Sequence, residues 1–223
     1  GEWEPACRYL FSIGITLFSG SILRFCYINP SRLNAQQAVA VVGLAWIVLG
    51  LFCSIPLYFS GHYLSFIDAV FDGVSGLTTT GASLILDLDH LSYADNTFRF
   101  MMHLLGGLGL IVVALSLGIF GKRSGASLYR SEGRSEHVVP NVVHTTRFIA
   151  KVTAILIVMS TVLVMIVMLI SGIEPARAAL QAFWVSISGF VTGGFTPMQQ
   201  SILYYHSMPL EFILMVLMVM GSI

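Results

Sequence analysis

Residues 72–83, Asp-Gly-Val-Ser-Gly-Leu-Thr-Thr-Thr-Gly-Ala-Ser, form a polar, glycine-rich segment between two strongly apolar runs. At membrane depth, such a segment is tolerated only where it is buried in protein or lines water. The residues before it, Phe66 to Gly76, carry apolar side chains at helical spacing but are too few to cross a bilayer. A short helix that ends in Thr-Thr-Thr-Gly is typical of a pore helix that leads into an ion filter.

The same element occurs a second time. Shifting the chain by about 113 positions places residues 69–81 over residues 182–194. Five aligned pairs are identical: Ala69/Ala182, Ser75/Ser188, Gly76/Gly189, Thr79/Thr192 and Gly81/Gly194. Because both loops lie in matching apolar surroundings, the repeat favours a functional element over a chance polar turn.

The composition is that of an integral membrane protein. Hydrophobic residues make up 56% of the chain and charged residues 10%, and the mean hydropathy is +0.85. The formal net charge is zero and the basic residues do not cluster with aromatic ones, so no nucleic-acid partner is expected. The three cysteines lie in apolar runs, without the spacing of a disulfide framework or a metal site.

Apolar segments long enough to span a bilayer alternate with the two loops. The predicted spans are 7–28, 38–59, 98–120 and 148–171, and a further span begins at 209–223. A second pore helix is expected to open at Glu174-Pro175, because proline and a preceding acid both suit a helix N-terminus. We therefore expect an all-α integral membrane fold of repeated span–pore loop–span units, two of them visible and the second incomplete.

The charges predict an orientation for these units. The expected parts are an N-terminal span with its connector (1–36), a first unit (37–121), a basic loop (122–146) and a second, truncated unit (147–223). The positive-inside rule places the basic loop in the cytoplasm and both pore loops outside, where an acidic loop with Asp87, Asp89 and Asp95 also lies. Both units then run in the same direction, and residue 1 lies outside. We therefore expect a piece of a longer chain that lacks part of its N-terminus and its C-terminal half.

The motifs resemble the Trk/Ktr/HKT superfamily of potassium transporters, and in particular its bacterial TrkH-like branch. The resemblance rests on residues 71–82, on the glycine-rich residues 105–109 and on the second loop through Phe195, and it covers nearly all of the chain. It implies four pore-loop units around one pore, with glycine at the positions of Gly81 and Gly194 where potassium is selected. It also implies a multi-pass protein of the cell (inner) membrane, a homodimer and a cytosolic nucleotide-binding regulatory subunit.

The chemistry expected of the two loops is ion coordination by the backbone. A potassium ion sheds water only where oxygen ligands replace it, and rings of carbonyls can do so. The candidate ion-binding residues are Thr78, Thr79, Thr80, Gly81, Val191, Thr192, Gly193 and Gly194. Potassium is the expected transported ion, no covalent cofactor is expected, and membrane lipid is the expected surrounding partner.

Two alternatives stay open. The first is a sodium-conducting or weakly selective transporter of the same superfamily, and the second is a membrane anchor subunit that carries a redox cofactor. An enzyme is not expected, because the sequence shows no nucleophile–base set, metal cluster or phosphate loop. Among the charged residues, Asp68 and Asp72 are candidates either for cation binding at the outer mouth or for structural roles. Arg99 and His103, at the outer start of a span, are functional candidates as ionisable residues in a membrane segment, but they are expected to be interface anchors.

Overall fold

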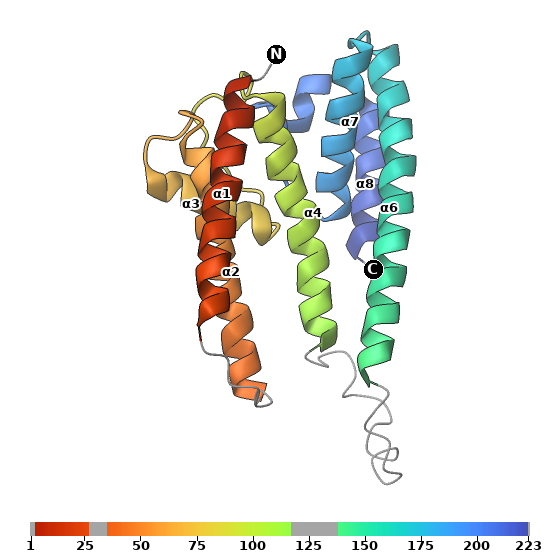
Figure 1. The fold of residues 1–223 in the computed structure, drawn as a ribbon. Helices are drawn as coiled ribbons and strands as arrows, with labels where there is room; N and C mark the ends of the chain where they lie inside the picture. Colours follow the sequence, from red (N-terminus) through yellow and green to blue (C-terminus); the bar gives the residue numbers. More distant parts are fainter. Residues whose placement is uncertain (1–2, 27–34, 117–137, 223) are drawn as a thin grey trace, which may run out of the picture.

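The computed structural model describes residues 3–26, 35–116 and 138–222. Within these residues the regular structure is entirely helical, which confirms the predicted fold class (Figure 1). The elements are α1 (Trp3–Phe25), α2 (Ala35–Tyr58), α3 (Phe66–Leu77), α4 (Tyr93–Ser116), α6 (Val138–Ile170), α7 (Pro175–Phe190), the 3₁₀ helix η2 (Ser201–Tyr205) and α8 (Met208–Ser222).

Four of these helices are long and apolar enough to cross a membrane: Trp3–Phe25, Ala40–Tyr58, Tyr93–Val113 and His144–Ile170. They correspond to the four complete spans predicted, with shifted ends. The third begins earlier than expected because the Ser92 hydroxyl accepts a hydrogen bond from the Asp95 amide at 3.0 Å, which caps the helix there. Helix α6 begins at Val138, inside the expected basic loop (122–146), and residues 122–137 of that loop lie outside the described residues.

The helices form two units with the same order: a long helix, a short helix and a further apolar helix, which is long in the first unit and shorter in the second. The first unit, α2–α3–α4, packs around the buried residues Leu57, Tyr63, Ala69, Leu77 and Met102. The second unit, α6–α7–α8, has its own core: Val164, Met168, Ala178, Ala182, Val185, Tyr205, Leu210, Leu214 and Leu217. A third cluster joins the two units: Phe100, Ile157, Trp184, Ile187 and Phe195. The repeat seen in the sequence is therefore a repeat of structure.

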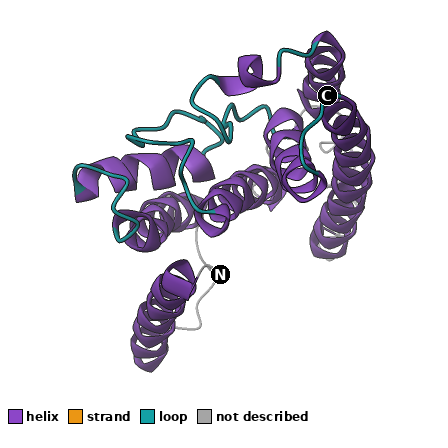
Figure 2. Cartoon of the chain, turned by 90° about the horizontal axis from the view of Figure 1, so that it is seen from above, coloured by secondary structure: helices purple, strands orange, loops and turns teal. Residues whose placement is uncertain are grey.

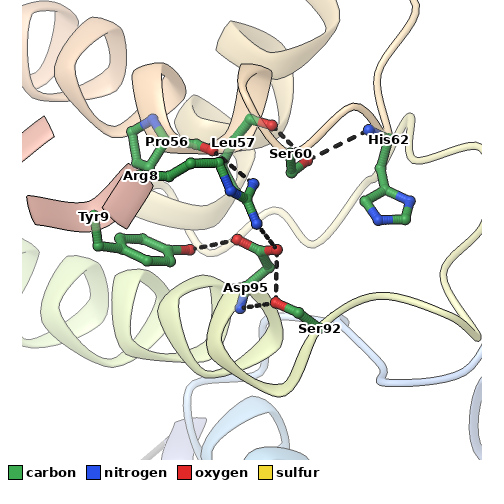
Figure 3. Close-up of polar contacts among 8 residues, drawn as sticks. All are labelled: Arg8, Tyr9, Pro56, Leu57, Ser60, His62, Ser92 and Asp95. Carbon is green, nitrogen blue, oxygen red and sulfur yellow. Dashed lines mark hydrogen bonds and ion pairs between the residues drawn. The ribbon is translucent and has the colours of Figure 1, made fainter. Parts of the chain in front are cut away.

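Helix α1 lies at the edge of the molecule (Figure 2) and is tied to the first unit by polar side chains (Figure 3). Arg8 donates to one carboxylate oxygen of Asp95 at 2.9 Å, and the Tyr9 hydroxyl donates to the other at 2.8 Å. The Ser92 hydroxyl donates to the same carboxylate at 2.7 Å. The expectation that Asp95 belongs to an outer acidic loop is wrong, because it lies in the first turn of α4, where these contacts bury it.

Candidate functional site

The two short helices begin by different local means. At the start of α3, the Ser65 hydroxyl accepts from the Asp68 amide at 3.2 Å, and the Asp68 carboxylate accepts from the Ser65 amide at 2.9 Å. This reciprocal capping box gives Asp68 the structural role, one of the two that the sequence allowed. Helix α7 begins at Pro175 after Glu174, as predicted, and Glu174 makes no side-chain capping bond.

The loops that follow α3 and α7 have the same backbone conformation. Thr79 and Thr192 both have left-handed backbone angles, with φ of 54° and 51°. Gly81 and Gly194 also have positive φ, at 76° and 93°. A left-handed conformation is uncommon for threonine, so its presence at both matched positions shows that the surrounding structure imposes one path on both loops.

Hydrogen bonds back to the short helices hold this path. The amides of Thr80 and Gly193 donate to the carbonyl oxygens of Ser75 and Ser188, respectively, both at 2.9 Å. In the first loop the Ser75 hydroxyl also donates to the Ala82 carbonyl oxygen at 2.7 Å. Each loop therefore folds back over the C-terminal end of its own short helix.

The two loops lie directly against each other. A Cβ atom added at Gly81 would overlap the Gly193 carbonyl oxygen and would lie 2.7 Å from its carbonyl carbon, so only glycine fits there. A Cβ at Gly194 would lie 3.8 Å from the Thr80 carbonyl oxygen, which leaves room. The structure brings together in these loops all of the predicted ion-binding residues: Thr78, Thr79, Thr80, Gly81, Val191, Thr192, Gly193 and Gly194.

Each short helix also ends against a glycine of the last helix of its own unit. A Cβ at Gly106 of α4 would overlap the Leu77 carbonyl oxygen, and one at Gly221 of α8 would overlap the Phe190 carbonyl oxygen. Leu77 and Phe190 are the last residues of α3 and α7. The glycine-rich stretch of α4 thus permits close helix packing, as the sequence indicated.

A buried ion pair lies behind the first loop. The Arg99 Nε donates to an Asp72 carboxylate oxygen at 3.1 Å, and the Tyr63 hydroxyl donates to the same oxygen at 2.9 Å. Asp72 and Arg99 are both 0% exposed. Burial and the neighbouring Asp72 carboxylate raise the pKa of Tyr63 well above its ordinary value, so its hydroxyl stays a proton donor.

These contacts correct two expectations, those for Arg99 and His103. Arg99 is not an interface anchor, because it is the buried partner of Asp72, which thereby has the structural one of the two roles that the sequence allowed. His103 is also fully buried rather than at an interface. Its Nδ1 lies 2.8 Å from the Gly76 carbonyl oxygen, and its ring stacks on Phe195 with centroids 4.2 Å apart. The spacing of Arg99 and His103, one helical turn apart on α4, was the available sign that both face the same neighbour.

The fold and the paired loops define an all-α integral membrane protein built from repeated pore-loop units. The family model for TrkH, described as a cation transport protein, matches residues 11–223, so the chain belongs to this family. A family of cation transport proteins is one of transporters and not of enzymes, as the sequence predicted.

Individual relatives agree with the family match. The chain is 31% identical to a Trk system potassium uptake protein, TrkI, of Halomonas elongata over 93% of its own length and 42% of that protein's. It is also 31% identical to TrkH of Escherichia coli K12, over 87% of its own length and 40% of that protein's. The crystal structure of the potassium transporter TrkH from Vibrio parahaemolyticus superposes with a TM-score of 0.77 at 25% identity, covering 96% of this chain and 42% of that one. The chain therefore spans less than half the length of these relatives.

Proposed function

We propose that this chain contributes two of the pore loops of a potassium uptake protein, and that residues 78–81 and 191–194 line its selectivity filter. The observation that carries this proposal is the shared left-handed path of two adjacent loops, one of which approaches the other so closely at Gly81 that no side chain fits. Relatives named as potassium uptake proteins support potassium as the ion.

The surroundings of the loops suit a cation. Helices α3 and α7 both end where their loops begin, and the C-terminal end of a helix carries a partial negative charge. Seven of the eight proposed filter residues are at least partly exposed, and Gly193 is the buried one. Backbone carbonyls of these residues are ligands of the kind that replace the water of a potassium ion. Among the described residues, no group of three or more His, Cys, Asp or Glu side chains could hold a metal.

The rest of the proposed assembly follows from the family. Two further pore loops would come from the remainder of a full-length protein, in a multi-pass protein of the cell (inner) membrane surrounded by lipid. We place the filter loops on the outside and the basic stretch around residues 122–146 in the cytoplasm. Relatives that are named as parts of a Trk system support a cytosolic regulatory subunit, for which we propose the nucleotide-binding kind, and we propose a homodimer.

The test is uptake by the full-length parent protein in cells that lack their own potassium uptake systems. Rubidium uptake, growth at low potassium and competition by sodium are measured with and without a co-expressed regulatory subunit, against an empty vector. We expect growth rescue and rubidium uptake that sodium inhibits only weakly. Rescue with strong sodium uptake would establish the sodium-conducting alternative instead. Absence of any uptake by correctly inserted protein together with its regulatory subunit would reject the proposal.

A further inference from the structure

Helix α4 packs against both short helices, so its side chains are placed to contact both loops. We propose that His103 of α4 is a positioning residue that sets the spacing between the two filter loops and thereby the preference for one cation over another. This inference rests on the proposed function of residues 78–81 and 191–194.

His103 first contacts the loop of its own unit. Because a carbonyl oxygen can only accept, the Nδ1 of His103 carries the hydrogen in its 2.8 Å bond to the Gly76 oxygen. The same oxygen accepts from the amide of Thr79 at 3.2 Å. Thr79 is the residue that takes the left-handed conformation in the first loop. The imidazole therefore holds the carbonyl to which the turn of the first filter loop is anchored.

The other side of the same ring contacts the second loop. A Cβ atom added at Gly193 would overlap the Nε2 and Cδ2 atoms of His103 and would lie 3.3 Å from Cε1. The ring also stacks on Phe195, two residues further along that loop, with an angle of 3° between the planes. Phe195 is 1% exposed and lies beneath the Arg99 guanidinium, 4.1 Å from its ring centroid. One imidazole thus fills the space between the two loops.

The surroundings of the His103 Nε2 atom indicate that the ring contacts the second loop by close packing. This nitrogen is buried and forms no hydrogen bond of standard geometry among the described residues. What lies against it is the Gly193 backbone, where no side chain would fit. The ring therefore joins a hydrogen bond on the first loop to close van der Waals contact on the second.

Among the described residues of the second unit, no side chain forms such a bridge. Met102 and Leu217 occupy matched places, because a Cβ at Gly76 would lie 3.2 Å from the first and a Cβ at Gly189 would lie 3.3 Å from the second. Gly106 and Gly221, which meet the ends of the two short helices, are separated along the chain by the same number of residues as Met102 and Leu217. This offset pairs His103 with Met218, which has no hydrogen to donate and is 40% exposed. Met218 is therefore the natural control position.

The experiment uses two variants of His103 in the full-length parent protein. His103→Phe keeps a flat ring against Phe195 but loses the donor to Gly76, whereas His103→Asn keeps a donor near the Nδ1 position but loses the ring. Met218→Phe introduces the same aromatic side chain at the matched position. Rubidium uptake, its inhibition by sodium and the amount of protein in the membrane are measured for each.

We expect His103→Phe to lower the potassium-to-sodium preference about tenfold at an unchanged protein level, the size of effect that one lost buried hydrogen bond can have. His103→Asn should retain more of the preference, and Met218→Phe should leave it unchanged. An unchanged preference in His103→Phe would overturn the proposal. A lower amount of both His103 variants in the membrane, with an unchanged potassium-to-sodium preference of the protein that remains, would also overturn it, because this result indicates a role in folding alone. A wild-type protein that prefers sodium would reject the proposed function. The positioning role would still be tested in that case, because it requires that His103→Phe change the potassium-to-sodium preference.

Discussion

The two pore units share one loop conformation but differ in what lies behind it. Behind the first loop are a buried ion pair and a buried imidazole. From its own unit, the second loop has aliphatic side chains behind it, with Leu214 and Leu217 closest to Gly189, 3.2 and 3.3 Å from where its Cβ would be. The polar residues of the first unit are matched by apolar ones in the second: Asp72 by Val185, Arg99 by Leu214 and His103 by Met218.

This difference indicates that the loop conformation does not need an ion pair within its own unit, because the second unit has aliphatic side chains at the positions that match Asp72 and Arg99. A buried ion pair is weak support for stability, since the loss of hydration opposes the attraction between the charges. What the polar residues of the first unit add is a connection, because Arg99 and His103 both contact Phe195 of the second loop. We infer that the charges join the two units rather than shape either loop.

The largest expected effect is on the potassium-to-sodium preference, and it should differ between the two filter glycines, Gly81 and Gly194. Gly81→Ser should reduce the potassium-to-sodium preference more than tenfold, because its Cβ collides with the Gly193 backbone and its φ is 76°. Gly194→Ser also has strained φ, at 93°, but has room for a Cβ and should be milder. Rubidium uptake with sodium competition measures both. If Gly194→Ser were the more severe variant, the contact between the loops would be wrongly placed.

The next effect tests whether the buried charges are needed for the first loop. Asp72→Val alone should lower stability by about 3–5 kcal/mol, because Arg99 is left buried without its partner. Combining it with Arg99→Leu copies the second unit and should recover most of that loss. The unfolding midpoint of the purified full-length protein in detergent measures both variants. A double variant no more stable than the single one would show that the charges support the loop itself.

A smaller effect tests the equivalence of α4 and α8. Gly106→Ala and Gly221→Ala should each lower stability by about 1–3 kcal/mol, because each new methyl group meets the last carbonyl oxygen of a short helix. Gly14→Ala is the control, since no atom lies within 4 Å of its Cβ position. The same unfolding measurement in detergent applies. Clearly unequal effects of the first two variants would break the structural correspondence between the units.

The smallest effect concerns the serines behind the loops. Ser75→Ala should cost about 1 kcal/mol, because it removes the 2.7 Å bond to the Ala82 carbonyl oxygen. Ser188→Ala should cost less, as no such side-chain bond is present in the second loop as described. Both variants should keep their cation preference in the rubidium uptake assay. A severe loss of preference in Ser75→Ala would place this hydroxyl in the pore lining.

The short helices and their loops could be predicted because their signals are local. The first helix was expected to end at Gly76 and ends at Leu77, and the second begins at the predicted Pro175. A serine–aspartate capping box, a proline in the first turn and glycines at positive φ all act within a few residues of where they stand. The internal repeat added the second loop by comparison with the first.

The roles of Asp72, Arg99 and His103 could not be predicted in the same way. Asp72 and Arg99 stand 27 residues apart, and so do Gly76 and His103, on helices that meet only in the folded protein. A charged residue near the end of a span has the same local appearance whether it faces an interface or a buried partner. The sequence by itself determined where helices, glycine turns and repeated loops form, because these depend on neighbouring residues. Only the tertiary structure decided which polar side chains meet and which loop each one supports, because burial and pairing depend on contacts between distant segments.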